Sequence, residues 1–297
     1  MNLTALHTTH RFLLASLLLL FTLAACGREQ NSPGNDFADL LLTLEQELDG
    51  TIGVFAMDTM TGNELAYRAD ERFAMASTFK SLLVAAVLAE VDAGTLDLEE
   101  RYGIDGVDMQ SYSPVVGKLA PNETISLSEL CAAAITISDN TATNMLLELI
   151  GGPDELTQFL RRSGDDVTRL DRYETALNSN DKGDERDTTT PRAMTHSMYR
   201  LLTSDLLSSA SKQRITEWLI ASQTGFSRLR AGLPPGWTVG DKTGMGRNGA
   251  ANNFAIAWPP GRKPVVMTVF MSWSDTDVDT LNVAHARIAA HIAAAFE

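Results

Sequence analysis

The sequence predicts an α/β protein of the α+β type, in which an antiparallel sheet from the N- and C-terminal segments is flanked by helices and carries an inserted all-helical lobe. Three observations predict it. Strand-like runs occur near the start of the chain, helical periodicity fills its centre, and strand-like runs return near its end. Distant segments must therefore complete one sheet, and the central helices must lie outside it.

Composition is that of a globular protein. The 297 residues are 44% hydrophobic, which is ample for a core. The formal net charge of −14 argues against non-specific binding to nucleic acid, because phosphate contacts need a basic face. We expect a monomer without a cofactor. We also expect no metal site, since the histidines beyond the first segment lack the spacing of metal ligands; they are His196, His285 and His291.

The first 25 residues predict a secretory signal. They contain no acidic residue, and the apolar run Phe12–Leu23 is too short to span a bilayer comfortably. The following Leu-Ala-Ala-Cys26 resembles the lipobox of bacterial lipoproteins, which is cleaved before a cysteine that carries a diacylglyceryl group. An ordinary signal peptide with an incidental Cys26, or an uncleaved helix, is the alternative. Residues 26–36 then form the lipidated cysteine and a polar tether. We expect an exported protein anchored through Cys26 to a bacterial membrane, on the periplasmic side if the cell is Gram-negative.

The folded domain is predicted over residues 37–297, with an α/β lobe at about 37–75 and 218–297 and a helical lobe at about 76–217. Apolar residues recur at helical spacing from Phe37 to Leu48. Two short strand-like runs follow, joined by a Gly-Asn turn. They cover residues 51–57 and 64–67.

The central part is mostly helical by period. The predicted helices cover residues 79–91, 126–137, 140–150, 153–161 and 191–202. Ser126 and Glu129 have the spacing of a capping box, and Pro153 and Pro191 stand where a helix can begin. Cys131 lies in an apolar helical stretch and is predicted to be a buried, inert thiol. With Cys26 lipidated, no internal disulfide is expected.

The C-terminal part returns to strand character. Strands are predicted at 238–242, 253–258 and 264–272, the last two joined by Pro-Pro-Gly. An Ala-rich helix from Asp275 to Phe296 closes the chain. These strands would complete the sheet that the N-terminal runs begin.

The candidate nucleophile is Ser77, in a Ser-x-x-Lys sequence just before the helix 79–91. Residues three apart share a helix face, so Lys80 can reach the Ser77 hydroxyl, and a desolvated lysine can act as a base. The pattern also occurs at Ser179 and at Ser209. Alone it is compatible with a helix cap followed by a surface lysine.

Two more triplets stand at element boundaries. A Ser-Asp-Asn triplet could aim the Ser138 hydroxyl and the Asn140 amide at a cleft, although a plain helix N-cap is the alternative. A Lys-Thr-Gly triplet ends a predicted strand. Lys242 and Thr243 offer a cation and a hydroxyl to a carboxylate, and Gly244 allows a ligand to approach closely. A charged strand end with a turn is the alternative there.

The order and spacing of these elements resemble the penicillin-recognising serine enzymes, namely the β-lactamases and penicillin-binding proteins. Residues 172–178, Arg-Tyr-Glu-Thr-Ala-Leu-Asn, resemble the Arg-x-Glu-x-x-Leu-Asn stretch of the class A Ω-loop. Similarity covers nearly all of residues 37–297. The chain therefore resembles a class A serine β-lactamase, in a lipoprotein form.

The resemblance implies hydrolysis of β-lactam antibiotics, and hence β-lactam resistance, through an acyl-enzyme on Ser77. Lys80 would assist proton transfer, and Ser138 would pass a proton to the departing ring nitrogen. The backbone N–H groups of Ser77 and Met245 would form the oxyanion hole. Glu174 would activate the deacylating water, while the base for acylation, Lys80 or Glu174, is left open.

The resemblance also implies a set of substrate-binding residues for a small β-lactam. These are Tyr112, Asn140, Asn178, Arg228, Lys242, Thr243 and Gly244. A surface charge is the alternative for Arg228. Arg172 and Asp187 could pair at the base of the Ω-loop. Tyr173 and Thr175 stand where Trp and Pro are frequent in the family, which leaves the conformation of the peptide before Thr175 open.

Four other classes of protein compete with this interpretation. One is a metallo-hydrolase, which the histidine spacing argues against. A D,D-peptidase-like penicillin-binding protein is the closest, and Glu174 argues against it. A Ser-His-Asp hydrolase would need a Gly-x-Ser-x-Gly elbow and suitable histidines. A lipoprotein that only binds cell-wall fragments is a non-enzymatic alternative, in which the side chains of the three motifs would have no catalytic role.

Overall fold

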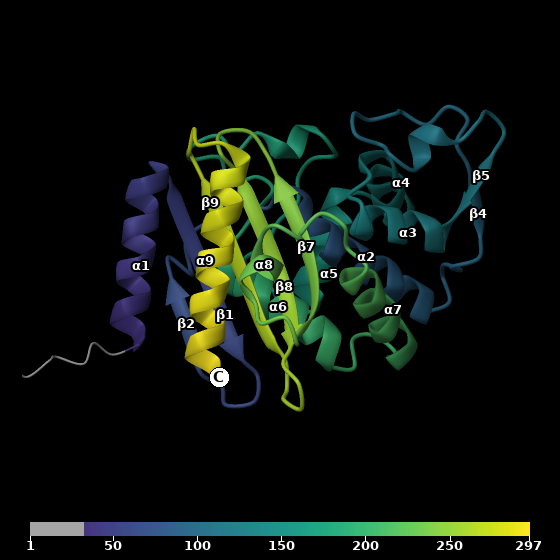
Figure 1. Ribbon diagram of the computed structural model, residues 1–297. Coiled ribbons are helices and arrows are strands. Elements are labelled where there is room, and N and C mark those ends of the chain that lie inside the picture. The colour runs from purple at the N-terminus through teal and green to yellow at the C-terminus, as the bar shows by residue number, and fades with distance from the viewer. Residues whose placement is uncertain (1–32) are drawn as a thin grey trace, which may run out of the picture. The chain divides into compact units, whose positions relative to one another are not determined.

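A five-stranded antiparallel sheet with the order β2-β1-β9-β8-β7 is the centre of the computed structural model, which describes residues 33–297 (Figure 1). Its strands are β1 (Thr51–Asp58), β2 (Glu64–Tyr67), β7 (Thr238–Met245), β8 (Ala251–Trp258) and β9 (Val265–Ser272). The N-terminal β1 pairs along its whole length with the C-terminal β9. This pairing confirms the predicted sheet made from the two ends of the chain. The predicted signal segment, Cys26 and most of the tether lie outside the described residues.

The two faces of the sheet belong to two separate hydrophobic cores. Side chains alternate along a strand, so in β8 Ala255 joins one core while Phe254 and Ile256 join the other. The helices α1 (Pro33–Leu48) and α9 (Val278–Phe296) cover the first face and lie beside each other in Figure 1. The second face packs against the helical lobe, whose helix α6 (Pro191–Thr203) contacts β1 and β9.

The helical lobe surrounds one buried helix, α2. The lobe helices are α2 (Phe79–Asp92), α3 (Leu127–Thr136), α4 (Asn140–Ile150), α5 (Pro153–Arg162), α6 (Pro191–Thr203) and α7 (Ser209–Ile220). Every residue of α2 from Phe79 to Leu88 is buried, including the polar Lys80 and Ser81. A helix apolar on nearly all sides is expected only where protein surrounds it. A side chain on the first turn of α2, such as that of Lys80, therefore lies in the interior of the protein.

Short elements complete the fold. They are β3 (Phe73–Ala74), β4 (Arg101–Gly103), β5 (Thr124–Ser126), β6 (Thr188–Thr189), α8 (Leu229–Gly232) and the 3₁₀ turns η1 (Ala76–Thr78), η2 (Val116–Lys118) and η3 (Ala176–Asn178). The sequence interpretation missed these and α7. The proposed lobe boundary at residue 217 falls inside α7, whose serine-rich start carries little apolar periodicity.

Capping explains where helices begin. The capping box of α3 is confirmed, because Ser126 Oγ accepts from Glu129 N at 3.2 Å and Glu129 Oε2 accepts from Ser126 N at 2.8 Å. The predicted start of the last helix at Asp275 is wrong. Asp277 caps α9 by accepting from Thr280 N at 3.0 Å, so the helix begins after it.

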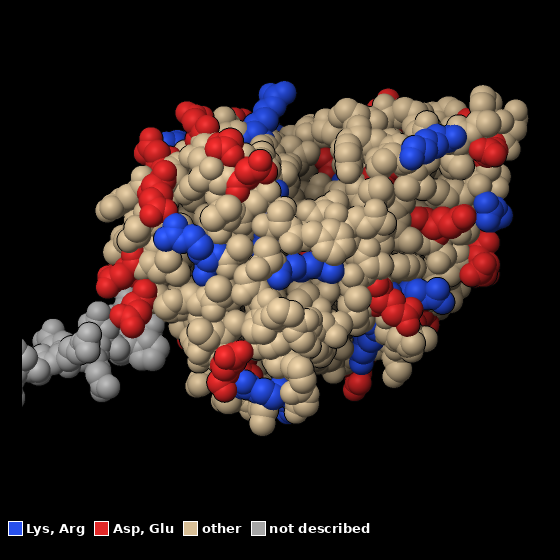
Figure 2. Space-filling view, viewed as in Figure 1, with Lys and Arg blue, Asp and Glu red and all other residues tan. Residues whose placement is uncertain are grey.

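The buried state of Cys131 agrees with the sequence interpretation. Cys131 is a free, fully buried thiol, and burial raises its pKa, as expected of an inert residue. Figure 2 shows acidic and basic side chains interspersed on the face in view, without a continuous basic patch. Between residues 33 and 297, no helix combines the length and the apolar character that crossing a membrane requires.

Candidate active site

A cleft of about 360 Å³ collects most of the residues that the motifs predict. It is lined by Ser77, Tyr112, Ser138, Asn140, Asn178, Thr224, Arg228, Thr243, Gly244 and Met245. All but Thr224 were singled out from the sequence. A larger surface cavity of about 660 Å³ lies beside β4 and β5 and contains none of the predicted site residues. The sequence-distant motifs therefore converge on one place.

Close contact between β7 and η1, the 3₁₀ turn that leads into α2, places Ser77 in this cleft. A Cβ added to Gly244 would lie 2.9 Å from the carbonyl oxygen of Met75 and 3.0 Å from Ser77 N. Only glycine allows this approach without displacing the backbone. The next residue along β7 is Met245, so both predicted oxyanion-hole residues line the same cleft.

Lys80 lies beneath the cleft and is fully buried. Its Nζ lies 3.0 Å from Glu174 Oε1 and donates to Asn140 Oδ1 at 2.6 Å and to the Ser138 carbonyl oxygen at 3.0 Å. Burial lowers the pKa of Lys80, although the Glu174 carboxylate opposes that shift. The amine is thus suited to exchange a proton with its neighbours.

The Ser138 hydroxyl lies between two buried lysines. Lys80 Nζ donates to Ser138 Oγ at 3.3 Å and Lys242 Nζ at 3.1 Å. Burial and the nearby charge of Lys80 lower the pKa of Lys242. Because both lone pairs of Ser138 Oγ accept from lysines, its own proton is free to point into the cleft. This arrangement suits a residue that delivers a proton.

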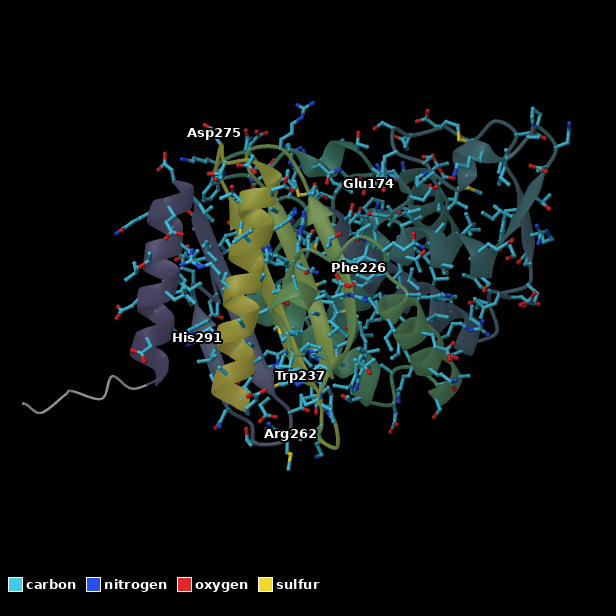
Figure 3. All side chains as sticks on the ribbon, in the orientation of Figure 1. Glu174, Phe226, Trp237, Arg262, Asp275 and His291 are labelled. Carbon is cyan, nitrogen blue, oxygen red and sulfur yellow. The ribbon has the colours of Figure 1, made fainter. Side chains whose placement is uncertain are left out.

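Glu174 is held at both its main chain and its side chain, at the boundary between the sheet and the helices (Figure 3). Asn144 of α4 accepts from Glu174 N and donates to the Glu174 carbonyl oxygen, each at 2.9 Å. Asn178 Nδ2 donates to Glu174 Oε2 at 2.7 Å, and Ser77 Oγ lies 3.3 Å from Glu174 Oε1. The peptide between Glu174 and Thr175 is cis.

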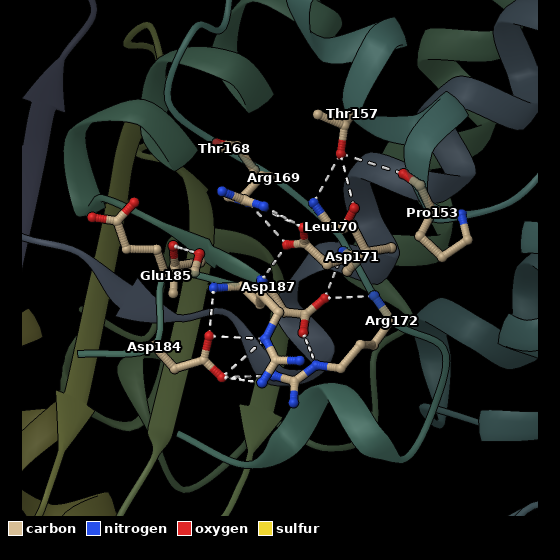
Figure 4. A network of polar contacts seen from close by, with 12 residues as sticks. Pro153, Thr157, Thr168, Arg169, Leu170, Asp171, Arg172, Asp184, Glu185 and Asp187 are labelled. Atoms are coloured by element: carbon tan, nitrogen blue, oxygen red, sulfur yellow. Dashed lines mark hydrogen bonds and ion pairs between the residues drawn. The ribbon is translucent and has the colours of Figure 1, made fainter. Parts of the chain in front are cut away.

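The segment Arg172–Asp187, called the Ω-loop below, is closed by a buried carboxylate (Figure 4). Asp187 accepts from the N–H groups of Asp171 at 2.7 Å and Arg172 at 2.9 Å. Arg172 Nε also donates to it at 2.5 Å. The pair predicted from the sequence therefore exists, and it ties the two ends of the loop together.

Arg228 is only 5% exposed, so the alternative of a surface charge is wrong. Its guanidinium donates to Asn282 Oδ1 at 2.9 Å, to the Asn252 carbonyl oxygen at 2.7 Å and to the Gly244 carbonyl oxygen at 3.1 Å. Burial lowers its pKa to about 10. It stays a cation at neutral pH on the same side of the cleft as Lys242 and Thr243.

The mouth of the cleft is marked by Tyr112, which is 59% exposed. Its carbonyl oxygen accepts from Asn140 N at 3.1 Å, while Asn140 Nδ2 donates to Ser111 O at 2.8 Å. At the opposite wall Thr243 Oγ1 donates to Thr224 Oγ1 at 2.6 Å. The predicted binding residues thus surround one opening.

Sequence reasoning missed three residues of the site: Asn144, Thr224 and Asn282. Asn144 could have been found, because it lies four residues after Asn140 and therefore on the same helix face. Thr224 stands in an irregular loop and Asn282 on a helix without a motif. Neither carries a local signal.

Comparison with known proteins agrees with this geometry. A family model described as "Beta-lactamase enzyme family" matches residues 35–296. β-Lactamase AST-1 of Nocardia asteroides is 46% identical over 239 residues, which cover 80% of this chain and 77% of that protein. The carbapenem-hydrolysing β-lactamase KPC of Klebsiella oxytoca is 45% identical, with 80% of each chain covered.

Solved structures agree as well. An ancestral class A β-lactamase, GNCA, is similar with a TM-score of 0.85 and 50% identity, covering 88% of this chain and 100% of that one. The sheet built from both chain ends, the helical lobe and the converging motifs match one family in sequence and in structure. The chain belongs to the class A β-lactamase family.

Proposed function

We propose that this protein hydrolyses β-lactam antibiotics, and so confers resistance to them, with Ser77 as nucleophile and Glu174 as the base for deacylation. One observation carries the proposal: a single carboxylate meets the nucleophile, a buried lysine and an amide. Glu174 lies within 3.3 Å of Ser77 Oγ, 3.0 Å of Lys80 Nζ and 2.7 Å of Asn178 Nδ2. A general base must lie within such reach of the proton it takes.

In the acylation step, Ser77 Oγ attacks the lactam carbonyl carbon and loses its proton to the Lys80–Glu174 pair. The developing oxyanion is stabilised by the N–H groups of Ser77 and Met245. When the ring C–N bond breaks, the nitrogen takes the Ser138 proton. Lys80 and Lys242 both contact Ser138 Oγ and can return a proton to it.

In the deacylation step, Glu174 takes a proton from a water that attacks the ester carbon of acylated Ser77. Asn178 supports this role through its contact with Glu174 Oε2. Within residues 33–297, Asn178 Oδ1 is buried and has no hydrogen-bond partner, so it can accept from the same water. The ester C–O bond then breaks, and Ser77 Oγ takes the proton that Glu174 accepted from the water, which restores the Glu174 carboxylate.

The substrate carboxylate is expected to bind Lys242 and Thr243, with Arg228 as a supporting cation behind them. An anionic ligand needs this local positive charge, since the chain as a whole carries a net charge of −14. Asn140 would bind the acylamino group, and Tyr112 would cover the opening.

Steady-state hydrolysis of a chromogenic cephalosporin tests the proposal. Many turnovers per molecule are expected from the parent, and none above background from Ser77→Ala. A penicillin-binding protein would instead stop at a stable acyl-enzyme after one turnover. That outcome, or retained turnover in Ser77→Ala, would overturn the proposal.

We further propose that the protein is exported and anchored through a lipid on Cys26, as the lipobox-like sequence suggests. Mass spectrometry of the mature protein should find a diacylglyceryl group on Cys26. A Cys26→Ser variant should move from the membrane fraction to the soluble fraction. A mature, unmodified N-terminus at another residue would refute the anchor.

We also propose that the domain acts as a monomer, because Ser77, Lys80 and Glu174 of one chain already contact one another in the geometry that the reaction needs. Sedimentation analysis of the exported domain should give a single species of monomer mass. Activity that depends on a dimer would contradict this.

A further inference from the structure

Two asparagine side chains join the middle of the Ω-loop to the turn between β7 and β8. Asn180 Nδ2 donates to the carbonyl oxygens of Asn248 at 2.9 Å and Arg247 at 3.3 Å. Asn248 Nδ2 donates to the carbonyl oxygens of Ser179 at 3.0 Å and Asn180 at 3.2 Å. Each side chain binds the main chain of the opposite segment. We call these four hydrogen bonds the asparagine latch.

The backbone at both latch residues suits asparagine. Asn180 and Asn248 each have φ of +50°, a left-handed conformation that asparagine tolerates better than most residues. The end of β9 supports both. Trp273 N donates to Asn248 O at 2.6 Å, Trp273 Nε1 donates to Asn180 O at 3.3 Å, and Ser272 Oγ donates to Asn180 Oδ1 at 3.3 Å. The latch is therefore fixed to the central sheet.

Side chains fill only part of the space between these two segments, because a cavity of about 370 Å³ lies between them. The cavity is lined by Thr175, Ala176, Asn178, Ser179, Met245, Gly246 and Arg247. One main-chain bond also crosses, from Arg247 N to Asn178 O at 2.8 Å. The four latch bonds add to this main-chain bond and restrict rotation of the loop about it.

The two segments carry the two halves of the deacylation apparatus. Asn178, two residues before Asn180, holds the Glu174 carboxylate. Met245, three residues before Asn248, is the proposed oxyanion donor of β7. The Met245 N–H binds the carbonyl oxygen of the acyl-enzyme ester, and the water that Glu174 activates must reach the carbon of the same ester. The distance between the two segments therefore determines whether the water can attack.

We propose that Asn180 and Asn248 are positioning residues that hold the Ω-loop at the distance from β7 that deacylation requires. This inference rests on the proposed function. Acylation also uses Met245, which its pairing with Ala251 holds in the sheet, but its nucleophile Ser77, its lysine Lys80 and its proton donor Ser138 lie outside the latch segments. Deacylation additionally needs a water between Glu174 and Asn178, both of which belong to the Ω-loop. Loosening the latch should therefore slow deacylation and leave acylation nearly unchanged.

A kinetic signature separates this role from a merely structural one. In a two-step covalent reaction kcat/KM reports the steps through acylation, whereas kcat also includes deacylation. A variant slow only in deacylation loses kcat and KM in the same proportion and keeps kcat/KM. General destabilisation instead lowers the amount of active enzyme, which lowers kcat and kcat/KM together.

Two latch variants and one control test the proposal with a chromogenic cephalosporin. Asn180→Asp keeps size and backbone preference and removes the donor. Asn248→Gly removes the exposed side chain while accepting the positive φ, so the fold is expected to persist. Asn122→Gly is the matched control, because Asn122 has φ of +68° and lies exposed in the loop before β5.

Both latch variants should slow the decay of the Ser77 acyl-enzyme by about tenfold or more, with kcat/KM within about twofold of the parent. The control should match the parent. Unchanged decay in Asn180→Asp and Asn248→Gly, or parallel loss of kcat and kcat/KM, would overturn the latch while leaving the proposed function intact. A parent that stops at the acyl-enzyme would overturn both.

Discussion

Replacing Gly244 by alanine tests the contact that brings β7 against the nucleophile. The added methyl group would lie 2.9 Å from the Met75 carbonyl oxygen, 3.0 Å from Ser77 N and 3.1 Å from Ala76 Cβ. Two of these atoms are backbone, so a side-chain rotation cannot relieve the overlap. The strand or the start of α2 must move by several tenths of an ångström.

The expected loss follows from what that movement displaces. Overpacking of this kind costs about 1–3 kcal/mol of folding free energy, which lowers the melting temperature by roughly 2–4 °C per kcal/mol in a domain of this size. Ser77 N is a proposed oxyanion donor, and impairing one such donor costs about 10²-fold in rate, or about 2.7 kcal/mol of transition-state stabilisation. We therefore expect kcat/KM to fall by about two orders of magnitude.

The assay compares Gly244→Ala with Gly103→Ala by cephalosporin hydrolysis and by thermal unfolding followed with circular dichroism. A Cβ at Gly103 would meet no atom within 4 Å, so that variant should match the parent in both measurements. Parent-like kcat/KM and melting temperature in Gly244→Ala would refute the reasoning. A loss of stability without a loss of kcat/KM would refute the oxyanion part of it.

Three further predictions concern other parts of the molecule. Burial lowers the pKa of His285 to about 3, so on acidification the unfolded chain takes up the proton first and stability falls between about pH 6.5 and 3. Urea unfolding should show a drop from pH 7 to pH 5 that is about 2 kcal/mol larger in the parent than in His285→Leu, and equal drops would contradict this. Asn144→Ala should leave both main-chain groups of Glu174 unpaired, costing about 1–3 kcal/mol locally, and should increase hydrogen exchange in the Ω-loop. Unchanged exchange there would show that Asn144 does not hold Glu174 in place. Ser126→Ala should lower the unfolding free energy by about 1 kcal/mol in urea titrations without changing kcat. An unchanged unfolding free energy would show that the capping box does not stabilise the protein.

Much of the fold could be predicted from the sequence because its elements carry strong local patterns. Apolar periodicity identified α2 and α4, and alternation or apolar runs identified the strands of the sheet. The ends of elements were less predictable. β7 continues to Met245 because it pairs there with Ala251 across the turn, a contact between positions that no local pattern connects.

The candidate site could be predicted as far as its residues belong to motifs. Ser77, Ser138 and Lys242 belong to the Ser-x-x-Lys, Ser-Asp-Asn and Lys-Thr-Gly motifs. The structure brings these motifs together at one cleft. Thr224 and Asn282 depend on which loop or helix face meets β7 in three dimensions. Such contacts arise only from tertiary packing, which a single sequence does not display.

Rapid-quench mass spectrometry of a Glu174→Gln variant tests the central claim most directly. Glutamine keeps the size of Glu174 but cannot take the proton of the attacking water. We predict that this variant, mixed with a chromogenic cephalosporin, accumulates nearly stoichiometric acyl-enzyme on Ser77 and turns over at least about a hundredfold more slowly than the parent. Parent-like turnover without an accumulated adduct would contradict the assignment of Glu174 as the base for deacylation.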